Sequence, residues 1–182
     1  MKRIGYGQVE PNHLSAQRNG KIYAQLPADS TLTLIENGMF LKYDYAAGVV
    51  NIDKEEAVID GEWLLVYNEV KTYDARETYK DFALKAENAH DGVLVPRLFK
   101  TDIGDIFTTN CIGAYGAANA ATNINDTLTF GTNEDVGDYL IINGGYLTPS
   151  ATKAANGGMT WKIVQQYTMP DGQGALKIQR VQ

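Results

Sequence analysis

The most reactive side chains in this sequence are one cysteine and two histidines, and they define the first candidate site. Cys111 could act as a nucleophile with His90 as its general base, and Asp91 could orient the imidazole. Cys111 lies at the end of an expected strand, between Asn110 and Ile112, where a free cysteine is usually a small core residue. We therefore expect a protein without a catalytic residue.

Acidic residues and glycines could form two further kinds of site. Carboxylates that could donate oxygen ligands to calcium are Asp102, Asp105, Glu134, Asp135 and Asp138. Their spacing lacks the regular ligand series of a calcium loop, and no pair of acids stands out for glycoside hydrolysis. Gly113–Gly116 resembles half of a phosphate-binding loop but lacks its third glycine, its Lys-Ser/Thr pair and a following helix. The sequence thus predicts no metal and no cofactor.

Composition excludes several classes of protein. A single cysteine cannot form an internal disulfide or a cysteine-built zinc site. The net charge of −6 disfavours nucleic acid as a partner, because lysine and arginine supply most of that affinity. No apolar run approaches the roughly 18 residues that span a bilayer, and Met1–Gly7 is not followed by the apolar stretch of a secretory signal. We expect no membrane partner.

Tyrosine is the dominant aromatic residue, with 11 copies against 5 phenylalanines and 2 tryptophans. Tyrosine is enriched at protein interfaces, since its ring combines an apolar body with a polar tip. The tyrosines in or near expected loops are Tyr6, Tyr23, Tyr43, Tyr45, Tyr73, Tyr79 and Tyr115. Either they form an interface or they are half-buried in a β domain.

The elements that would position these side chains are mostly short strands. Alternating and β-branched runs predict strands at 31–35, 39–43, 46–52, 62–70, 93–99, 102–110, 127–130, 139–142, 146–147, 161–167 and 175–181. Asn37-Gly38 predicts a tight hairpin between the first two. Helical spacing of apolar residues predicts at most one short helix, at 74–89. The fold class is therefore mainly β, an antiparallel sandwich or barrel.

The strand around Trp63 carries the strongest core prediction. In an extended strand, Trp63 shares one face with Leu65 and Tyr67, while Leu64 and Val66 share the other. We expect Trp63 to anchor the core of the first β unit.

Four segments are expected along the chain. Residues 1–30 are interrupted by glycine and proline but carry spaced apolar residues, which indicates an extended arm. A first β unit at 31–112 and a linker or long loop at 113–126 follow, then a C-terminal β unit at 127–182 that could be continuous with the first. The arm holds four basic and two acidic residues, whereas residues 31–75 hold nine acidic and three basic ones. This predicts a basic arm beside an acidic body.

Several segments of the first 110 residues resemble one class of viral protein. They are Gly7–Leu14, Arg18–Pro27, Leu34–Leu41 and Gly61–Val70. Together they are similar to the small auxiliary head proteins of tailed bacteriophages, which accompany the major capsid protein and decorate or cement the shell. The resemblance covers about residues 7–110, and it implies no catalytic residue.

The resemblance also implies a partner and a place. The partner would be the major capsid protein, with a homo-oligomer possible, and the location would be the exterior of the virion after synthesis in the host cytoplasm. The arm would face the shell, and strand addition to a neighbouring sheet edge is one available mode. The expected contact residues in the arm are Tyr6, Val9, Pro11, Leu14, Arg18 and Tyr23.

Two other functions stay open. A tail or baseplate component with a receptor- or carbohydrate-binding face would show exposed tryptophan and tyrosine beside Asp and Asn. Both tryptophans, Trp63 and Trp161, lie instead within expected strands, which indicates core positions. A small hydrolase would need a tight Cys/His or acid pair in a pocket.

Overall fold

The computed structural model describes residues 7–13, 22–32, 34–52, 62–68, 83–85, 95–113, 137–170 and 172–182. Within these residues the chain is built from strands, with a single 3-10 turn, η2 (Ala155–Gly157). The mainly β fold expected from the sequence is confirmed. No helix in the described ranges is long and apolar enough to cross a membrane.

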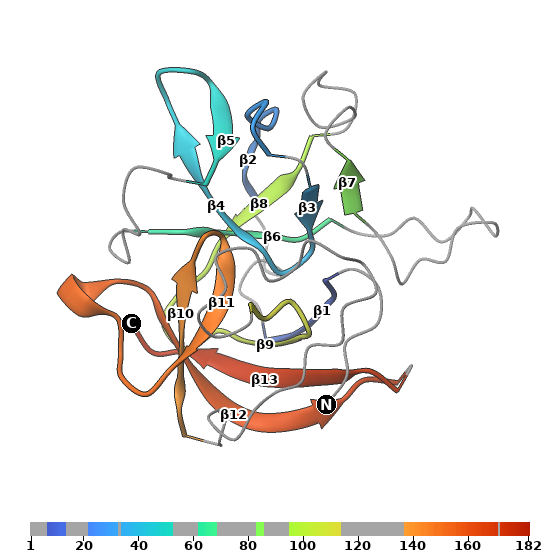
Figure 1. Cartoon of the computed structure of the whole chain (residues 1–182), viewed down its shortest axis with the longest axis vertical. Coiled ribbons are helices and arrows are strands. Elements are labelled where there is room, and N and C mark those ends of the chain that lie inside the picture. Colours follow the sequence, from blue (N-terminus) through green and yellow to red (C-terminus); the bar gives the residue numbers. More distant parts are fainter. Residues whose placement is uncertain are drawn as a thin grey trace.

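The described strands form three sheets with antiparallel pairing (Figure 1). The six-stranded sheet, in the lower half of the view, has the order β1 (Val9–His13), β9 (Ile106–Thr109), β13 (Gly174–Arg180), β12 (Thr160–Thr168), β10 (Tyr139–Asn143) and β11 (Tyr146–Ser150). The five-stranded sheet above it has the order β2 (Ile22–Gln25), β8 (Arg97–Lys100), β6 (Leu64–Val66), β4 (Phe40–Asp44) and β5 (Val49–Asn51). The third sheet pairs β3 (Leu34–Glu36) with β7 (Ala83–Lys85).

The space between the two large sheets is filled by the first hydrophobic core. Phe40 and Leu65 of the five-stranded sheet, together with Trp63, meet the inner face of the six-stranded sheet there. At its centre the Trp161 ring lies 4.9 Å from the Phe107 ring, edge to face, and 5.9 Å from the Phe40 ring. We call this cluster the sandwich core.

The five-stranded sheet is also buried on its other face. Leu41, Leu64 and Val66 belong to a second core, which also contains Leu32 and Ile35. Because successive side chains of a strand point to opposite faces, one three-residue strand serves both cores. The expected division of the Trp63 strand is confirmed, with Trp63 and Leu65 in the sandwich core and Leu64 and Val66 in the second.

An arginine joins the end of the chain to both large sheets. The Arg180 guanidinium donates two hydrogen bonds to the carboxylate of Glu62, at 2.9 Å to Oε1 and 2.8 Å to Oε2. It also donates to the Thr101 hydroxyl at 3.0 Å and to the Thr101 carbonyl. This paired geometry links β13 to the segments that lead into β6 and out of β8.

Two parts of the expected arm are strands of the protein's own sheets. β1 pairs with β9, Val9 opposite Thr109, and β2 pairs with β8, Gln25 opposite Arg97. The expected arm is therefore not separate from the β body at 9–13 and 22–25, where it forms regular strands. The signal was missed because it lies in β8 and β9, whose outer backbone groups need partners. Deleting residues 1–30 would remove the outer strand of each large sheet rather than leave the β body intact.

The turn at Asn37-Gly38 exists, but it does not form the expected hairpin. The amide of Met39 donates to the carbonyl of Glu36 at 3.2 Å, and Gly38 has a φ of +95°. The strands on either side belong to different sheets, since β3 pairs with β7 and β4 pairs with β5 and β6. The turn therefore carries the chain from one layer to the next.

Part of the expected helix at 74–89 is strand. Residues Ala83–Lys85 form β7, with Leu84 opposite Ile35. The helix prediction is wrong for these residues, because pairing with β3 overrides the local helical spacing. The remainder of 74–89 lies outside the described residues.

Strands from both expected β units share one core. The six-stranded sheet joins β9, from the 31–112 segment, directly to β13, from the 127–182 segment. The sandwich core contains Phe40 and Phe107 as well as Leu140 and Trp161. Of the expected linker 113–126 only Gly113 is described, and the expected strand at 127–130 lies outside the described residues.

Candidate binding site on the β4–β5 hairpin

The hairpin formed by β4 and β5 projects from the five-stranded sheet (Figure 1). The carboxylate Oδ1 of Asp44 accepts hydrogen bonds from the amides of Ala46 at 3.0 Å and Ala47 at 2.9 Å. The amide of Gly48, which has a φ of +68°, donates to the Asp44 carbonyl at 2.9 Å. Asp44 thus holds the exposed turn in one conformation, in the manner of an Asx turn.

The tip of this hairpin presents a tyrosine ring to solvent. Tyr45 is 79% exposed, the highest value among the large hydrophobic residues reported for the described chain. Its ring centroid lies 5.3 Å from that of Tyr43, with an angle of 37° between the rings. Tyr43 in turn packs against the second core. The exposed ring is therefore supported from beneath by a ring that is anchored in the fold.

A pocket of about 250 Å³ lies against this hairpin. The described residues that line it are Lys42, Tyr43, Asp44, Tyr45 and Asn51. Strand pairing places Lys42 opposite Asn51, which brings the ammonium-bearing and amide-bearing side chains onto the same face.

Two polar atoms of these residues make no hydrogen bond to the described part of the chain. Asn51 accepts the Ile52 amide at 2.7 Å through Oδ1, and its Nδ2 makes no hydrogen bond within the described part of the chain. Asp44 uses Oδ1 in the turn, and its Oδ2 likewise makes none to the described residues. The described lining therefore includes one amide donor and one carboxylate acceptor.

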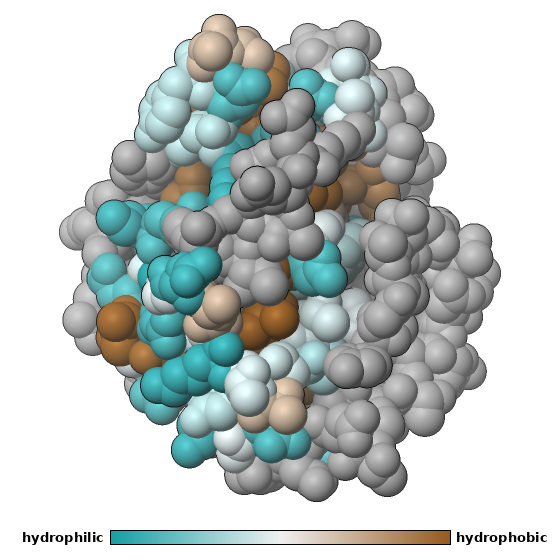
Figure 2. Space-filling view, turned by 60° about the vertical axis from the view of Figure 1, so that its left-hand side comes forward, coloured by the Kyte–Doolittle hydropathy of each residue, from teal (hydrophilic) through white to brown (hydrophobic). Residues whose placement is uncertain are grey.

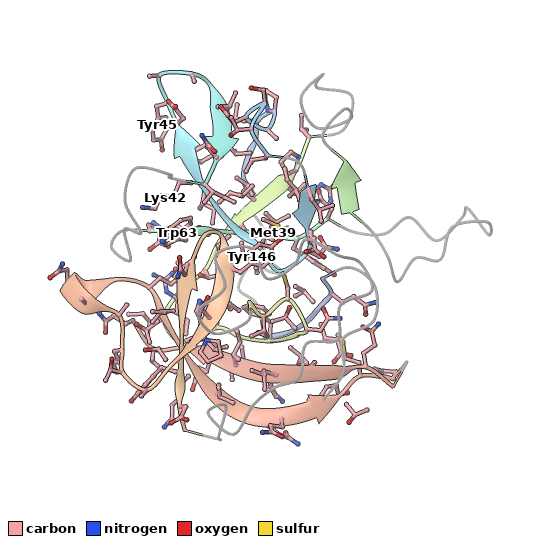
Figure 3. The ribbon with its side chains drawn as sticks, in the orientation of Figure 1. Met39, Lys42, Tyr45, Trp63 and Tyr146 are labelled. Atoms are coloured by element: carbon pink, nitrogen blue, oxygen red, sulfur yellow. The ribbon has the colours of Figure 1, made fainter. Side chains whose placement is uncertain are left out.

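The base of the hairpin rests on the sandwich core through Lys42. Its Nζ lies 4.5 Å from the centroid of the Trp63 ring, which is a cation–π contact. Trp63 is 3% exposed, and its Nε1 has no hydrogen-bond partner among the described residues. Figure 3 shows Tyr45, Lys42 and Trp63 following one another from the hairpin down towards the sandwich. The polar side of the pocket is thereby tied to a buried ring.

Of the residues expected to contact a partner through the arm, only Val9 has a described side chain. Val9 is half-buried and packs against the protein's own sandwich core. Pro11 and Tyr23 lie in β1 and β2, and their side chains are outside the description. Tyr6, Leu14 and Arg18 lie outside the described residues.

The candidate nucleophile is a core residue in this structure. Cys111 is fully buried and belongs to the second core, while His90 and Asp91 lie outside the described residues. The amide of Gly113 donates to the Leu147 carbonyl at 2.7 Å, so it serves the fold rather than a phosphate. Tyr115 and Gly116 are outside the description.

The candidate calcium ligands also act in the fold where they are described. Asp105 is buried, and its Oδ2 accepts the Asp102 amide at 2.8 Å, which closes the turn between β8 and β9. Asp138 is half-buried, and Glu134 and Asp135 lie outside the described residues. Across the described ranges, no group of three or more His, Cys, Asp or Glu residues could hold a metal ion.

A second surface is the outer face of the six-stranded sheet. Strand pairing aligns one row of residues across the sheet, in the order Ser150, Tyr139, Lys162, Gln179, Ile106 and His13. Their neighbours Trp161, Ile178 and Phe107 point into the sandwich core, so the side chains of Lys162, Gln179 and Ile106 point outward. Lys162 is exposed, and Tyr139, Gln179 and Ile106 are half-buried. The face mixes apolar and polar groups.

The surface seen from the side of the β4–β5 hairpin carries no large continuous apolar patch in its described part. Figure 2 shows hydrophilic residues with separate small hydrophobic areas between them. An interface built on this side would therefore depend on individual aromatic contacts rather than on one broad apolar area.

The sequence contained a signal for the hairpin that the strand assignment missed. The strand expected at 46–52 includes Ala46, Ala47 and Gly48, but these residues form the turn. An Asx residue followed by small residues and a glycine is the pattern of a tight turn.

Comparison with protein-family models, with curated proteins and with solved structures found no match for this chain.

Proposed function

We propose that the protein is a non-enzymatic structural component of a tailed-bacteriophage head that binds the lattice of the major capsid protein. The support begins with the sequence resemblance, whose strongest segments are Leu34–Leu41 and Gly61–Val70. The described parts of these segments include β6 and the start of β4, which pair with Phe40 opposite Leu65. The resemblance thus lies in residues that build the centre of the fold.

The observation that carries the proposal is the outer face of the six-stranded sheet. Its row of aligned residues combines an exposed lysine, Lys162, with the half-buried Tyr139 and Ile106. A mixture of this kind is typical of non-obligate protein interfaces, which are about as apolar as the remaining surface. A broad sheet face also suits an extended lattice better than a small ligand.

The edges of the same sheet favour binding through side chains. Its two outer strands each contain a proline, Pro11 in β1 and Pro149 in β11. Proline lacks the amide donor that strand addition requires, and it commonly protects sheet edges. Lattice binding would therefore use the side chains of the sheet face. Many copies bound to one shell would together stabilise its expanded state, because each copy binds that state in preference to the unexpanded one.

Sedimentation with expanded shells, isolated capsid subunits and DNA in parallel tests the proposal. We expect binding to shells well above binding to subunits, and none to DNA, because the chain carries a net charge of −6. Lys162→Glu should weaken shell binding several-fold. Lys153→Glu is the matched control, since it reverses the charge of another exposed lysine away from the sheet row.

Three results would contradict the proposal. Binding to DNA alone, lost as salt rises, would indicate a packaging protein. Equal binding to free subunits would indicate a chaperone or scaffold. An equal loss in the Lys162 and Lys153 variants would remove the sheet face as the contact surface.

A further inference from the structure

We propose that Asn143 is a site of spontaneous deamidation, in which its side chain closes onto the amide of Gly144 and the tip of the β10–β11 hairpin is slowly loosened. This inference concerns a turn of the fold and does not depend on lattice binding. It is drawn from the contrast between the Asn-Gly pairs within the described residues. These pairs are Asn37-Gly38, Asn143-Gly144 and Asn156-Gly157.

The reaction needs only an asparagine side chain, the next backbone nitrogen and water. The Gly144 nitrogen attacks Cγ of Asn143, the Cγ–Nδ2 bond breaks, and Nδ2 leaves as ammonia with the proton of the Gly144 amide. Water then opens the cyclic imide. Attack of water at Cγ gives aspartate, and attack at the main-chain carbon gives isoaspartate. Glycine favours ring closure because it has no Cβ to hinder the approach.

Both reacting groups of the Asn143-Gly144 pair lie in solvent. Asn143 is the last residue of β10, and both residues are exposed. Neither the Asn143 side chain nor the Gly144 amide makes a hydrogen bond to the described residues. Ring closure at this pair therefore requires rotation of the backbone and side chain of Asn143, without the loss of a side-chain hydrogen bond.

The Asn37-Gly38 pair is held at both reacting groups. Asn37 is 6% exposed, its Nδ2 donates to the Asn68 carbonyl at 3.1 Å, and its Oδ1 accepts the Asn68 amide at 2.8 Å. The attacking nitrogen would be that of Gly38, which donates to the Val66 carbonyl at 2.9 Å. These bonds must open before the ring can close, so the pair is protected.

The Asn156-Gly157 pair is exposed but has an unfavourable backbone conformation. Asn156 has a φ of 53° and a ψ of 28°. With this ψ, its Cβ and the Gly157 nitrogen lie nearly opposite each other about the Cα–C bond. In an extended residue such as Asn143 the two groups are at about a right angle. Asn143 therefore needs the smaller rotation to react.

The modification would act on a contact between layers. The carbonyl of Gly145 accepts the Phe40 amide at 2.8 Å, and a Cβ at Gly145 would lie 2.9 Å from Ile52 Cδ1. Isoaspartate at position 143 lengthens the main chain by one methylene close to this contact, whereas aspartate only adds an exposed negative charge. We expect the isoaspartate product to weaken the contact of the hairpin with the five-stranded sheet.

Peptide mapping by mass spectrometry tests the inference on the full chain, incubated folded at mildly alkaline pH. We expect Asn143 to deamidate at least about tenfold faster than Asn37, because Asn37 must first lose its hydrogen bonds. Asn156 should react at a rate between the two. Asn143→Gln should remove the fast reaction, since its longer side chain closes a ring less readily, and Asn156→Gln is the matched control that should leave it unchanged.

Thermal melts separate the backbone change from the added charge. Incubated wild-type protein should melt at a lower temperature than freshly prepared Asn143→Asp, which carries the charge without the longer main chain. Asn143→Gln should keep its melting temperature through the same incubation. The inference is overturned if Asn37 or Asn156 deamidates as fast as Asn143, or if incubated wild-type protein and fresh Asn143→Asp melt alike.

Discussion

The hairpins β4–β5 and β10–β11 both turn through glycines with positive φ, and only one of their tips is docked on the protein. In β10–β11 the carbonyl of Gly145 accepts the amide of Phe40 at 2.8 Å, and a Cβ at Gly145 would lie 2.9 Å from Ile52 Cδ1. In β4–β5 a Cβ at Gly48 would meet nothing within 4 Å. Similar backbone turns thus join two layers in one case and leave a tip open to solvent in the other.

A polar contact also separates the two hairpins. Tyr146, the first residue of β11, donates its hydroxyl to the buried carboxylate of Glu36 at 3.2 Å. Tyr45 is held by a ring contact and remains exposed. A tyrosine next to a turn therefore stabilises the fold when a buried partner accepts its hydroxyl, and is available for binding when its ring is left in solvent.

The largest expected effect comes from the residue beneath the open hairpin. Trp63→Ala should lower the free energy of unfolding by about 3–5 kcal/mol, because the ring is 3% exposed in the sandwich core and supports Lys42. Chemical denaturation measures it, with Ile103→Ala as the exposed control. A loss below about 1 kcal/mol would place the ring in solvent and contradict the core assignment.

Gly145→Ala tests the docked tip. The φ of +82° strains an alanine, and its Cβ would lie 3.0 Å from the Phe40 carbonyl oxygen, which cannot move without disturbing β4. We expect a loss of about 2–4 kcal/mol in unfolding free energy. Thermal and chemical denaturation should agree, and an unchanged stability would mean that the tip is not docked.

Gly48→Ala is the matched change in the open tip. The backbone strain is of the same kind, at a φ of +68°, but no neighbouring atom is displaced. The expected loss is about 1–2 kcal/mol, all of it from the conformation. The difference between the two glycine variants measures the steric cost of docking, and equal losses would remove the contrast between the hairpins.

The smallest change in stability is expected for Tyr45→Ala. A side chain that is 79% exposed contributes little to the folded state, so the unfolding free energy should shift by at most about 0.5 kcal/mol. A circular dichroism melt checks this. A much larger loss would show that the ring is structural, which would weaken its role as a binding surface.

The sequence predicted which face a strand residue occupies better than which strands pair. Alternation assigned Trp63 and Leu65 to one face correctly, because burial of a strand depends on a local period of two. The strands expected at 139–142 and 146–147 are present as β10 and β11, and they pair with each other. Which strands pair is a long-range property, so β7 with β3 and β2 with β8 carried no comparable local signal.

The candidate site followed the same division. Tyr43 and Tyr45 were among the tyrosines expected near loops. An exposed tyrosine beside Asp and Asn side chains is what the receptor- or carbohydrate-binding alternative predicts. Only the register of the hairpin shows that Lys42 and Asn51 lie opposite each other. The exposure of Tyr45 depends on the whole surface, and no local pattern encodes it.

The central position of β9 has a consequence for how the chain folds. β9 lies between β1 and β13, and at its end Asn110 binds Gln8, 102 positions away, and Gln173, 63 positions away. Pairings between such distant segments close large loops before they gain stability, which slows folding to the millisecond-to-second range. During synthesis β9 would have β1 as a partner while β13 is still unmade. We therefore expect the sandwich to assemble only after β13 has left the ribosome.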